Sequence, residues 1–265
     1  MWEEPCISGE KGSGTVFFSG CNMRCVYCQN HEISSGLKGI ELDDGEVKNL
    51  FLKISKSDVH NINLVTPTHY LPRLIKILSD IRKEIRVPIV YNCSGYENVA
   101  LLDECRGIID VFLTDFKYKS GQISKKYSDC SDYFQVAMTT LEKMVEIAGK
   151  PIFDDGIMKK GVILRHLILP SHKNDSMEIL RSLYKRFGND KFLVSLMSQF
   201  TPNESCQLYP EINRSVTSLE YKRVREVYEE LGFEGYIQER SSATEKYIPD
   251  FDEKGEFLLD NYTIL

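Results

Sequence analysis

The sequence predicts an α/β fold in which mostly parallel strands form a partial, open (β/α) barrel within a single domain, residues 1–265. Short apolar runs alternate along the chain with longer segments of helical periodicity, which is typical of a parallel sheet. The length of 265 residues suits one α/β barrel domain. Seven strand-like runs are found, rather than the eight of a closed barrel. We therefore expect the sheet to remain open.

Each expected strand is a short apolar run that ends at polar or turn-forming residues. The first, Thr15-Val16-Phe17-Phe18, leads directly into a cysteine-rich loop. In chain order the expected strands cover residues 14–19, 61–66, 88–93, 109–114, 161–168, 192–197 and 234–238.

The helices between these strands are predicted from apolar spacing and from end signals. Asp43-Asp44 supplies a plausible N-cap for the first helix, and Pro72 suits the opening turn of the second. Gly232 suits the position just after the last helix. The remaining helices are expected near 97–105, 131–148, 175–188 and 216–231.

Three segments depart from the alternation. Asp155-Gly156 lies between apolar residues, so a short β-hairpin insertion is expected near 152–160, leading into the strand that carries Arg165. The polar stretch 202–215 is expected to form a loop near the functional site. The tail 249–265 is expected to be irregular and to pack across one end of the barrel.

Composition excludes several classes of function. A net charge of −6 without a long basic run disfavours nucleic-acid binding, which requires phosphate neutralisation. No apolar run approaches the roughly 20 residues that span a bilayer, which disfavours a membrane protein. The start of the chain is acidic and lacks a secretion signal. Eight cysteines without paired spacing favour a reducing, cytoplasmic location.

The most informative motif is Cys21-x3-Cys25-x2-Cys28, directly after the first strand. Three such thiolates can ligate three irons of one cluster and leave a fourth iron open to bind a small molecule. Structural zinc usually needs a second cysteine or histidine pair, and ferredoxin clusters need a fourth cysteine. A zinc knuckle or three unrelated cysteines remain the alternatives. The other cysteines are isolated: Cys6, Cys93, Cys105, Cys130 and Cys206.

Polar residues gather at the carboxyl ends of the expected strands, where α/β barrels place their active sites. An open iron suits S-adenosylmethionine, whose amino and carboxylate groups can chelate it. Asp115 and Lys117 are two residues apart on a strand and therefore share a face. They are candidates to bind the amine and the carboxylate of the methionyl group, respectively. The alternative is that they form an ordinary ion pair at the barrel rim.

The cysteine motif, with Tyr27 before its last cysteine, resembles that of the radical SAM superfamily. The longer run from Gly20 to Asn30 is similar to the activating enzymes of glycyl radical enzymes. A closer resemblance is to iron–sulfur proteins similar to pyruvate formate-lyase activating enzyme. It extends over most of the chain, through runs at 2–9, 63–70, 91–96 and 247–251.

The resemblance implies cofactors and the residues that hold them. Cys21, Cys25 and Cys28 would ligate a [4Fe-4S] cluster, and S-adenosylmethionine would bind beside it. The backbone at Tyr27 would meet the adenine, and Asp115 with Lys117 would match the Asp-x-Lys of the activases. The cofactor-binding residues implied are Tyr27, Thr66, Thr68, Asn92, Ser94, Asp115, Lys117, Arg165 and Gln199.

Three positions depart from the family pattern. Thr66-Pro67-Thr68 stands where the superfamily has Gly-Gly-Glu, so backbone carbonyls or threonine side chains must take over binding of the methionyl amine. Asn92-Cys93-Ser94-Gly95 replaces the Asp-Thr-Asn-Gly of the activases, whose Asp and Thr help to hold a monovalent cation. Gln199 stands where the activases have histidine.

The expected function is that of an oxygen-sensitive radical SAM oxidoreductase. It would cleave S-adenosylmethionine reductively to a 5′-deoxyadenosyl radical, which abstracts hydrogen from a substrate. One candidate substrate is a glycyl radical enzyme, and the alternative is a peptide or a small metabolite. Flavodoxin or ferredoxin is the expected reductant. A non-catalytic iron–sulfur module for electron transfer or sensing is the alternative from another class.

Overall fold

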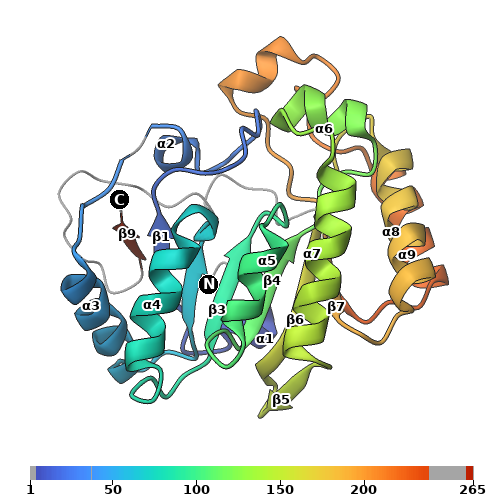
Figure 1. The fold of residues 1–265 in the computed structure, drawn as a ribbon. Coiled ribbons are helices and arrows are strands. Elements are labelled where there is room, and N and C mark those ends of the chain that lie inside the picture. The colour runs from blue at the N-terminus through green and yellow to red at the C-terminus, as the bar shows by residue number, and fades with distance from the viewer. Residues whose placement is uncertain (1–3, 37, 239–260, 265) are drawn as a thin grey trace.

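The computed structural model describes residues 4–36, 38–238 and 261–264. Their strands form one open, mostly parallel sheet with the order β8-β7-β6-β4-β3-β2-β1-β9, and β5 pairs with β6 at the side of this path. The open α/β barrel expected from the sequence is therefore confirmed (Figure 1). The strands are β1 Gly14–Phe18, β2 Ile62–Val65, β3 Ile89–Cys93, β4 Val111–Asp115, β5 Ile152–Asp154, β6 Ile157–Leu167, β7 Leu193–Met197, β8 Gly235–Ile237 and β9 Asn261–Ile264.

Helices cover the outer face of the sheet, and Figure 1 shows α3, α4, α5 and α7 lying over it side by side. None of the helices in the described ranges is long and apolar enough to cross a membrane. The α-helices are α1 Pro5–Ser8, α2 His31–Ser34, α3 Asp44–Lys56, α4 Leu71–Ile81, α5 Val99–Leu102, α6 Gly121–Ser128, α7 Tyr133–Ala148, α8 Lys173–Phe187 and α9 Ser218–Glu230. The short 3-10 turns are η1 Thr68–Tyr70, η2 Asp103–Cys105 and η3 Glu204–Leu208.

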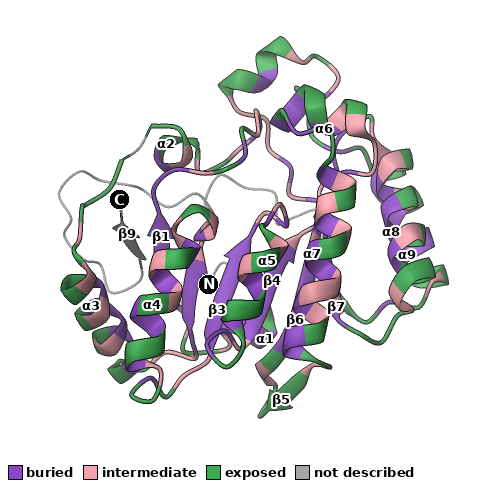
Figure 2. Ribbon diagram, in the orientation of Figure 1, coloured by how far each residue is buried: buried purple, intermediate pink, exposed green. Residues whose placement is uncertain are grey.

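The sheet separates two apolar cores. The larger core lies between the sheet and the outer helices, and the strands appear as a buried layer in Figure 2. The smaller core fills the inner face and includes Val111 and Leu113 of β4 and Ile163 of β6. Helix α1 closes this inner core with Cys6 and Ile7. The inner face of β4 and β6 is therefore apolar beside α1, while Asn61, just before β2, donates a hydrogen bond to the Ile7 carbonyl of that helix.

Local sequence signals explain where the elements begin and turn. Asp43 caps α3 through a capping box with Glu46, as its position before the apolar stripe predicts. Pro72 lies in the first turn of α4. Asp155 and Gly156 both have positive φ, at 49° and 75°. This conformation suits the tight turn between β5 and β6, so the predicted hairpin is present.

Several segments differ from the prediction, and the short helices α1 and α2 are among them. Residues 261–264 form strand β9, which pairs parallel to β1, although the tail from 249 onward was expected to be irregular. Residues 249–260 and 265 of that tail lie outside the described residues. Helix α6 was not predicted, because an eight-residue helix with few apolar side chains gives little periodic signal.

Candidate functional site

The three motif cysteines lie in the loop that leaves β1, and each sulfur has a different polar neighbour. The Cys25 Sγ accepts a hydrogen bond from the Ser128 hydroxyl at 3.0 Å. The Cys28 Sγ lies 3.4 Å from the Ser34 hydroxyl. The Cys21 Sγ accepts from the backbone N–H of Met23 at 3.4 Å. The loop thus presents three thiols from within eight residues of chain.

The electrostatics of these thiols show that they share one neighbourhood. Burial raises the pKa of the Cys25 thiol to about 12, and Cys21 and Cys28 add to the rise while Lys117 opposes it. Burial also raises the pKa of Cys21, with Cys28 again contributing. A metal or cluster that binds here must therefore displace protons from the thiols. The Lys117 ammonium is the nearby cation that favours their deprotonated form.

Three thiols from one loop are a donor set of the kind that binds iron–sulfur clusters. In the described part of the chain, no three His, Cys, Asp or Glu side chains converge closely enough to hold one metal ion. A [4Fe-4S] cluster does not need such convergence, since each thiolate binds its own iron.

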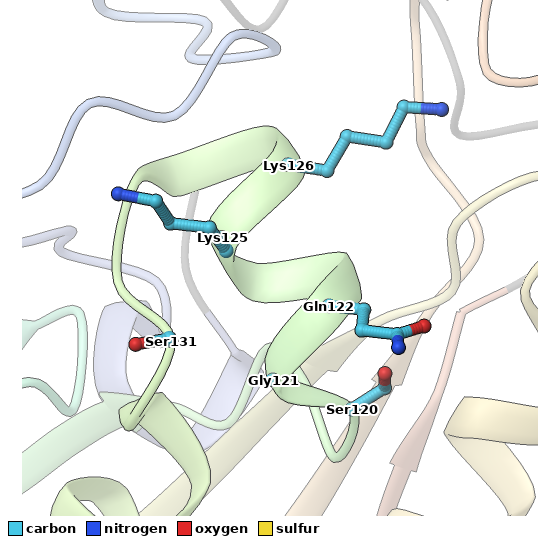
Figure 3. A pocket seen from close by; sticks show the side chains of 6 residues that line it. All are labelled: Ser120, Gly121, Gln122, Lys125, Lys126 and Ser131. Carbon is cyan, nitrogen blue, oxygen red and sulfur yellow. The ribbon is translucent and has the colours of Figure 1, made fainter.

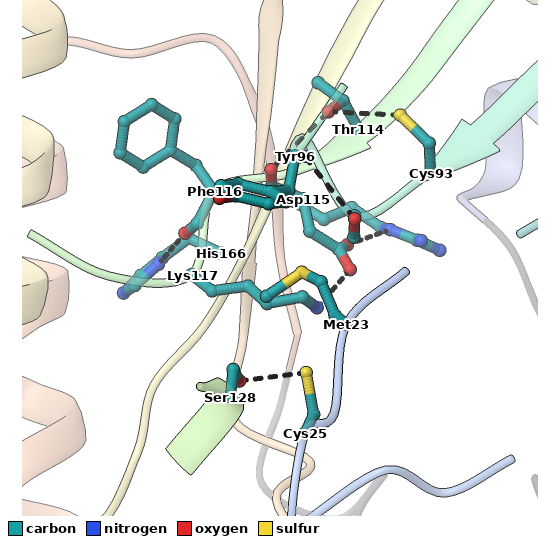
Figure 4. A network of polar contacts seen from close by, with 12 residues as sticks. Met23, Cys25, Cys93, Tyr96, Thr114, Asp115, Phe116, Lys117, Ser128 and His166 are labelled. Atoms are coloured by element: carbon teal, nitrogen blue, oxygen red, sulfur yellow. Dashed lines mark hydrogen bonds and ion pairs between the residues drawn. The ribbon is translucent and has the colours of Figure 1, made fainter. Parts of the chain in front are cut away.

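Beside the cysteine loop, four predicted residues form one polar network on the inner face of the sheet, and Figure 4 shows two of them, Asp115 and Lys117. The Asp115 carboxylate accepts from Lys117 Nζ at 2.5 Å and from Arg165 Nε at 3.0 Å. Arg165 Nη2 also donates to the Asn92 side-chain oxygen at 2.6 Å. The neighbouring strands β3, β4 and β6 thus bring together residues that are far apart in sequence.

The network is partly buried, and its one carboxylate lies between two cations. Burial raises the pKa of Asp115, but the charges of Lys117 and Arg165 outweigh it, so that pKa lies below its usual range. Burial lowers the pKa of Lys117, but Asp115 and Cys25 outweigh it, and the pKa is raised. Lys117 therefore stays charged between the carboxylate and the thiol. The ion pair that was the alternative interpretation of Asp115 and Lys117 is present, and it lies next to the cysteine loop.

A buried hydroxyl extends this polar layer. Ser195 of β7 pairs in register with Arg165 of β6, so it shares the inner face. Its Oγ is fully buried and has no hydrogen-bond partner within the ranges that the structure describes. Such a hydroxyl can serve a polar ligand on the inner face.

The segment Thr66-Pro67-Thr68, which follows β2, was predicted to bind the methionyl amine through backbone carbonyls or threonine side chains. Thr66 has a φ of 59°, a left-handed conformation that is costly for a β-branched residue. The Thr68 hydroxyl donates to Glu97 Oε1 at 2.9 Å, and the Tyr91 hydroxyl donates to Glu97 Oε2 at 2.7 Å. Tyr91 precedes Asn92 on β3 and so points to the outer face. The Thr68 hydroxyl is therefore engaged on the opposite side of the sheet from Asp115.

Glu97 was not predicted as a functional residue. It is only 5% exposed, and burial raises the pKa of its carboxyl. It is one residue beyond the matching run 91–96, and an isolated glutamate in a polar turn resembles a solvated one. Only its pairing with Thr68 and Tyr91 distinguishes it.

The other predicted residues, Ser94, Gln199 and Tyr27, are placed as follows. The Ser94 carbonyl accepts from the Tyr133 hydroxyl at 2.8 Å. Gln199 is half-buried, two residues after the end of β7. Tyr27 is buried, with its hydroxyl 2.5 Å from that of Tyr118. The loop at 202–215 lies against the cysteine loop, because Asn203 donates to the Cys28 carbonyl at 3.2 Å.

A surface pocket of about 750 Å³ lies along α6 (Figure 3). Its lysines already have acidic partners, since Lys125 pairs with Asp129 and Lys126 with Glu211. None of the polar network lines it. The lining residues are Ser120, Gly121, Gln122, Lys125, Lys126 and Ser131.

Comparisons with known proteins agree with this geometry. The model of the Radical SAM superfamily matches residues 15–155, more than half of the chain. An uncharacterized protein of Methanocaldococcus jannaschii is 30% identical over 226 residues, which cover 82% of this chain and 62% of that protein. The chain thus spans less than two thirds of the length of this relative.

Solved structures share the fold at low identity. Streptococcus suis SuiB bound to S-adenosylmethionine gives a TM-score of 0.57 at 10% identity, covering 96% of this chain and 58% of that one. Methylornithine synthase gives 0.51 at 14% identity, covering 80% and 61%. The superfamily uses a [4Fe-4S] cluster and S-adenosylmethionine, and a neighbour is seen with the latter bound. These are the cofactors that the sequence predicted, and the chain belongs to the radical SAM superfamily.

Proposed function

We propose that this chain is a radical SAM enzyme whose Cys21, Cys25 and Cys28 ligate three irons of a [4Fe-4S] cluster. When bound, the cluster and S-adenosylmethionine supply an electron and a 5′-deoxyadenosyl radical, which abstracts hydrogen from the substrate. The observation that carries the proposal is the position of Lys117. Its ammonium lies within electrostatic reach of Cys25 and is bonded to Asp115 at 2.5 Å.

The polar network is suited to hold the zwitterionic end of S-adenosylmethionine. The Asp115 carboxylate is the acceptor for a methionyl ammonium, and Lys117 and Arg165 are donors for a carboxylate. A zwitterion that inserts between Asp115 and Lys117 replaces one ion pair by two, so no charge is left without a partner. The buried hydroxyl of Ser195 is a further donor on the same face. This exchange limits the desolvation cost of binding.

The remaining predicted residues would complete the site from the neighbouring strand ends. The backbone at Tyr27 would meet the adenine, while Ser94 and Gln199 would border the ribose and the methionyl chain. Thr66 would act through its backbone, since the strained φ of 59° fixes the direction of its carbonyl. Flavodoxin or ferredoxin would supply the electron.

A glycyl radical enzyme is the first candidate substrate. Asp115, Lys117 and Arg165 match the pattern of the activases. A protein loop also needs a wide approach to the site, which the open sheet order from β8 to β9 favours.

A peptide is the second candidate substrate. SuiB has also been solved bound to its precursor peptide SuiA, with a TM-score of 0.57 over 86% of this chain and 49% of that one. An electron paramagnetic resonance spectrum of the reacted partner separates the two. A glycine-centred doublet supports activation, whereas a mass change in a peptide without that doublet supports modification.

Anaerobic reconstitution with iron and sulfide tests the proposed cluster. The wild-type protein should bind iron and sulfide in equal amounts, and it should form 5′-deoxyadenosine from S-adenosylmethionine and dithionite. Cys25→Ala should lose both properties. Cys105→Ala is the matched control, because Cys105 is fully buried in the outer core. It should keep both.

Three results would contradict the proposal. Zinc in place of iron would favour a structural metal site. A cluster that forms without binding S-adenosylmethionine would favour an electron carrier or sensor. A Cys105→Ala variant that loses iron while Cys25→Ala keeps it would refute the ligand assignment.

A further inference from the structure

A chain of buried hydroxyl groups ends on the sulfur of Cys25. The Ser128 hydroxyl donates to the Cys25 Sγ at 3.0 Å (Figure 4). The Ser128 Oγ lies 2.6 Å from the Tyr118 hydroxyl, which in turn lies 2.5 Å from the Tyr27 hydroxyl. The three hydroxyl-bearing residues are buried, with exposed fractions of 3%, 0% and 7% for Ser128, Tyr118 and Tyr27.

The direction of every bond in this chain follows from counting protons. A hydroxyl carries one proton and can donate only one hydrogen bond. Since Ser128 donates to Cys25, it must accept from Tyr118. Tyr118 has then used its own proton and must accept from Tyr27. All three dipoles therefore point toward the sulfur, and successive bonds in one direction strengthen each other in a buried site.

The chain is built from separate parts of the sequence. Tyr27 belongs to the cysteine loop, Tyr118 follows β4, and Ser128 is the last residue of α6. Helix α6 also bonds directly to the cysteine loop, because the backbone N–H of Val26 donates to the carbonyl of Tyr127 at 2.9 Å. The position of Ser128 against Cys25 is thus fixed by the backbone as well as by the hydroxyl chain.

We infer that Ser128, supported by Tyr118 and Tyr27, raises the reduction potential of the cluster bound at Cys25. This inference rests on the proposed function, in which Cys25 is a ligand. Hydrogen bonds to ligand sulfurs are one of the means by which proteins set the potentials of iron–sulfur clusters. A donor stabilises the reduced cluster more than the oxidised one, since the reduced cluster places more negative charge on its thiolates.

The test is a redox titration of the reconstituted protein, followed by electron paramagnetic resonance of the reduced cluster. In Ser128→Ala, the ratio of reduced to oxidised cluster at a fixed solution potential should fall by about 3- to 10-fold. This equals a shift of about 30–60 mV to lower potential for a one-electron couple. Tyr118→Phe should shift the potential in the same direction by less, because Ser128 keeps its own donor but loses the polarising bond.

Ser124→Ala is the matched control. Ser124 is a fully buried serine on the same helix, but its hydroxyl donates to the Gly121 carbonyl at 3.2 Å and not to a cysteine. Its potential should match that of the wild type. Circular dichroism of each variant checks that α6 and the rest of the fold are retained, and Tyr118→Phe remains informative if Ser128→Ala folds poorly.

The outcomes separate the inference from the proposed function. Wild-type protein without iron and sulfide would overturn the proposed function. An intact cluster whose potential is the same in Ser128→Ala and in the wild type would overturn the inference alone. An equal shift in Ser124→Ala would also overturn it, as would a shift to higher potential. A shift in Ser128→Ala without any in Tyr118→Phe would refute the contribution of the tyrosines.

Discussion

Asp115→Asn should weaken binding of S-adenosylmethionine because it removes a carboxylate from the polar network. Asp110→Asn is the matched control. Asp115 ends β4 and is bonded to two cations, Lys117 at 2.5 Å and Arg165 at 3.0 Å. Asp110 lies directly before the first residue of the same strand and is paired with Arg82 at 2.8 Å. Their side chains are 22% and 23% exposed, so the two carboxylates differ in location more than in burial.

The two substitutions should cost similar stability. Removing one partner of a buried ion pair costs about 3–5 kcal/mol. Partial exposure and the remaining amide oxygen reduce this, so we expect about 2–3 kcal/mol for each variant. The effect on the cofactor should differ. A hydrogen bond to a charged group is worth about 1.5–3 kcal/mol. Loss of the Asp115 carboxylate should therefore raise the Kd for S-adenosylmethionine by about 10- to 150-fold.

Two anaerobic measurements check this prediction. Urea unfolding of the cluster-free protein gives the stability of Asp115→Asn and Asp110→Asn. Calorimetric titration of the reconstituted protein with S-adenosylmethionine gives the Kd. Wild-type affinity in Asp115→Asn would refute the assigned role, and so would an equal loss of affinity in Asp110→Asn.

Three further substitutions test features around the site. Thr66→Gly should stabilise the protein by about 0.5–1 kcal/mol, because glycine adopts a φ of 59° without strain. The same variant should form 5′-deoxyadenosine more slowly. A less stable variant would show that Thr66 is not strained. Gly95→Ala should lower the free energy of unfolding by about 2–4 kcal/mol, because the new Cβ would come within 2.3 Å of the Asp115 carbonyl oxygen. Gly107 has a similar φ but no close neighbour, so Gly107→Ala should lower it by about 1–2 kcal/mol. Urea unfolding measures both values. Glu97→Gln should change the pH dependence of stability. Because burial raises the pKa of Glu97, the unfolded chain ionises first, near pH 4.3, and wild-type stability falls as pH rises above that value. Urea midpoints from pH 4.5 to 7.5 should decline less in Glu97→Gln than in the wild type, and parallel curves would count against a raised pKa of Glu97.

The parts of the fold that the sequence predicts are those with a strong local pattern. Strands β1 to β4 are recognised by their apolar runs, and helices α4 and α7 by apolar residues that recur with helical spacing. The hairpin turn at Asp155-Gly156 is set by two residues that tolerate positive φ. Strand β9 has no such pattern, and its pairing with β1 depends on contacts between distant segments.

The site shows the same division. The cysteine spacing and the polar strand ends are visible in the sequence, because each depends on a few neighbouring residues. Ser128 and Glu97 cannot be identified from the sequence, because they bond to residues that are distant in sequence. Ser128 bonds to Cys25, and Glu97 bonds to Thr68. A serine in a short polar helix and a glutamate in a turn ordinarily face solvent, so only the tertiary structure reveals them.

The parallel pairing of β1 with residues 261–264 has a consequence for biosynthesis. Strand β1 gains β2 as a neighbour early in translation, but its other edge stays unpaired until the ribosome has released residue 264. An unpaired strand edge is prone to intermolecular pairing. Because this strand leads directly into the cysteine loop, its alignment is completed only after residues 261–264 have been synthesised. Insertion of the inorganic cofactor is therefore expected to follow the synthesis of these residues rather than precede it.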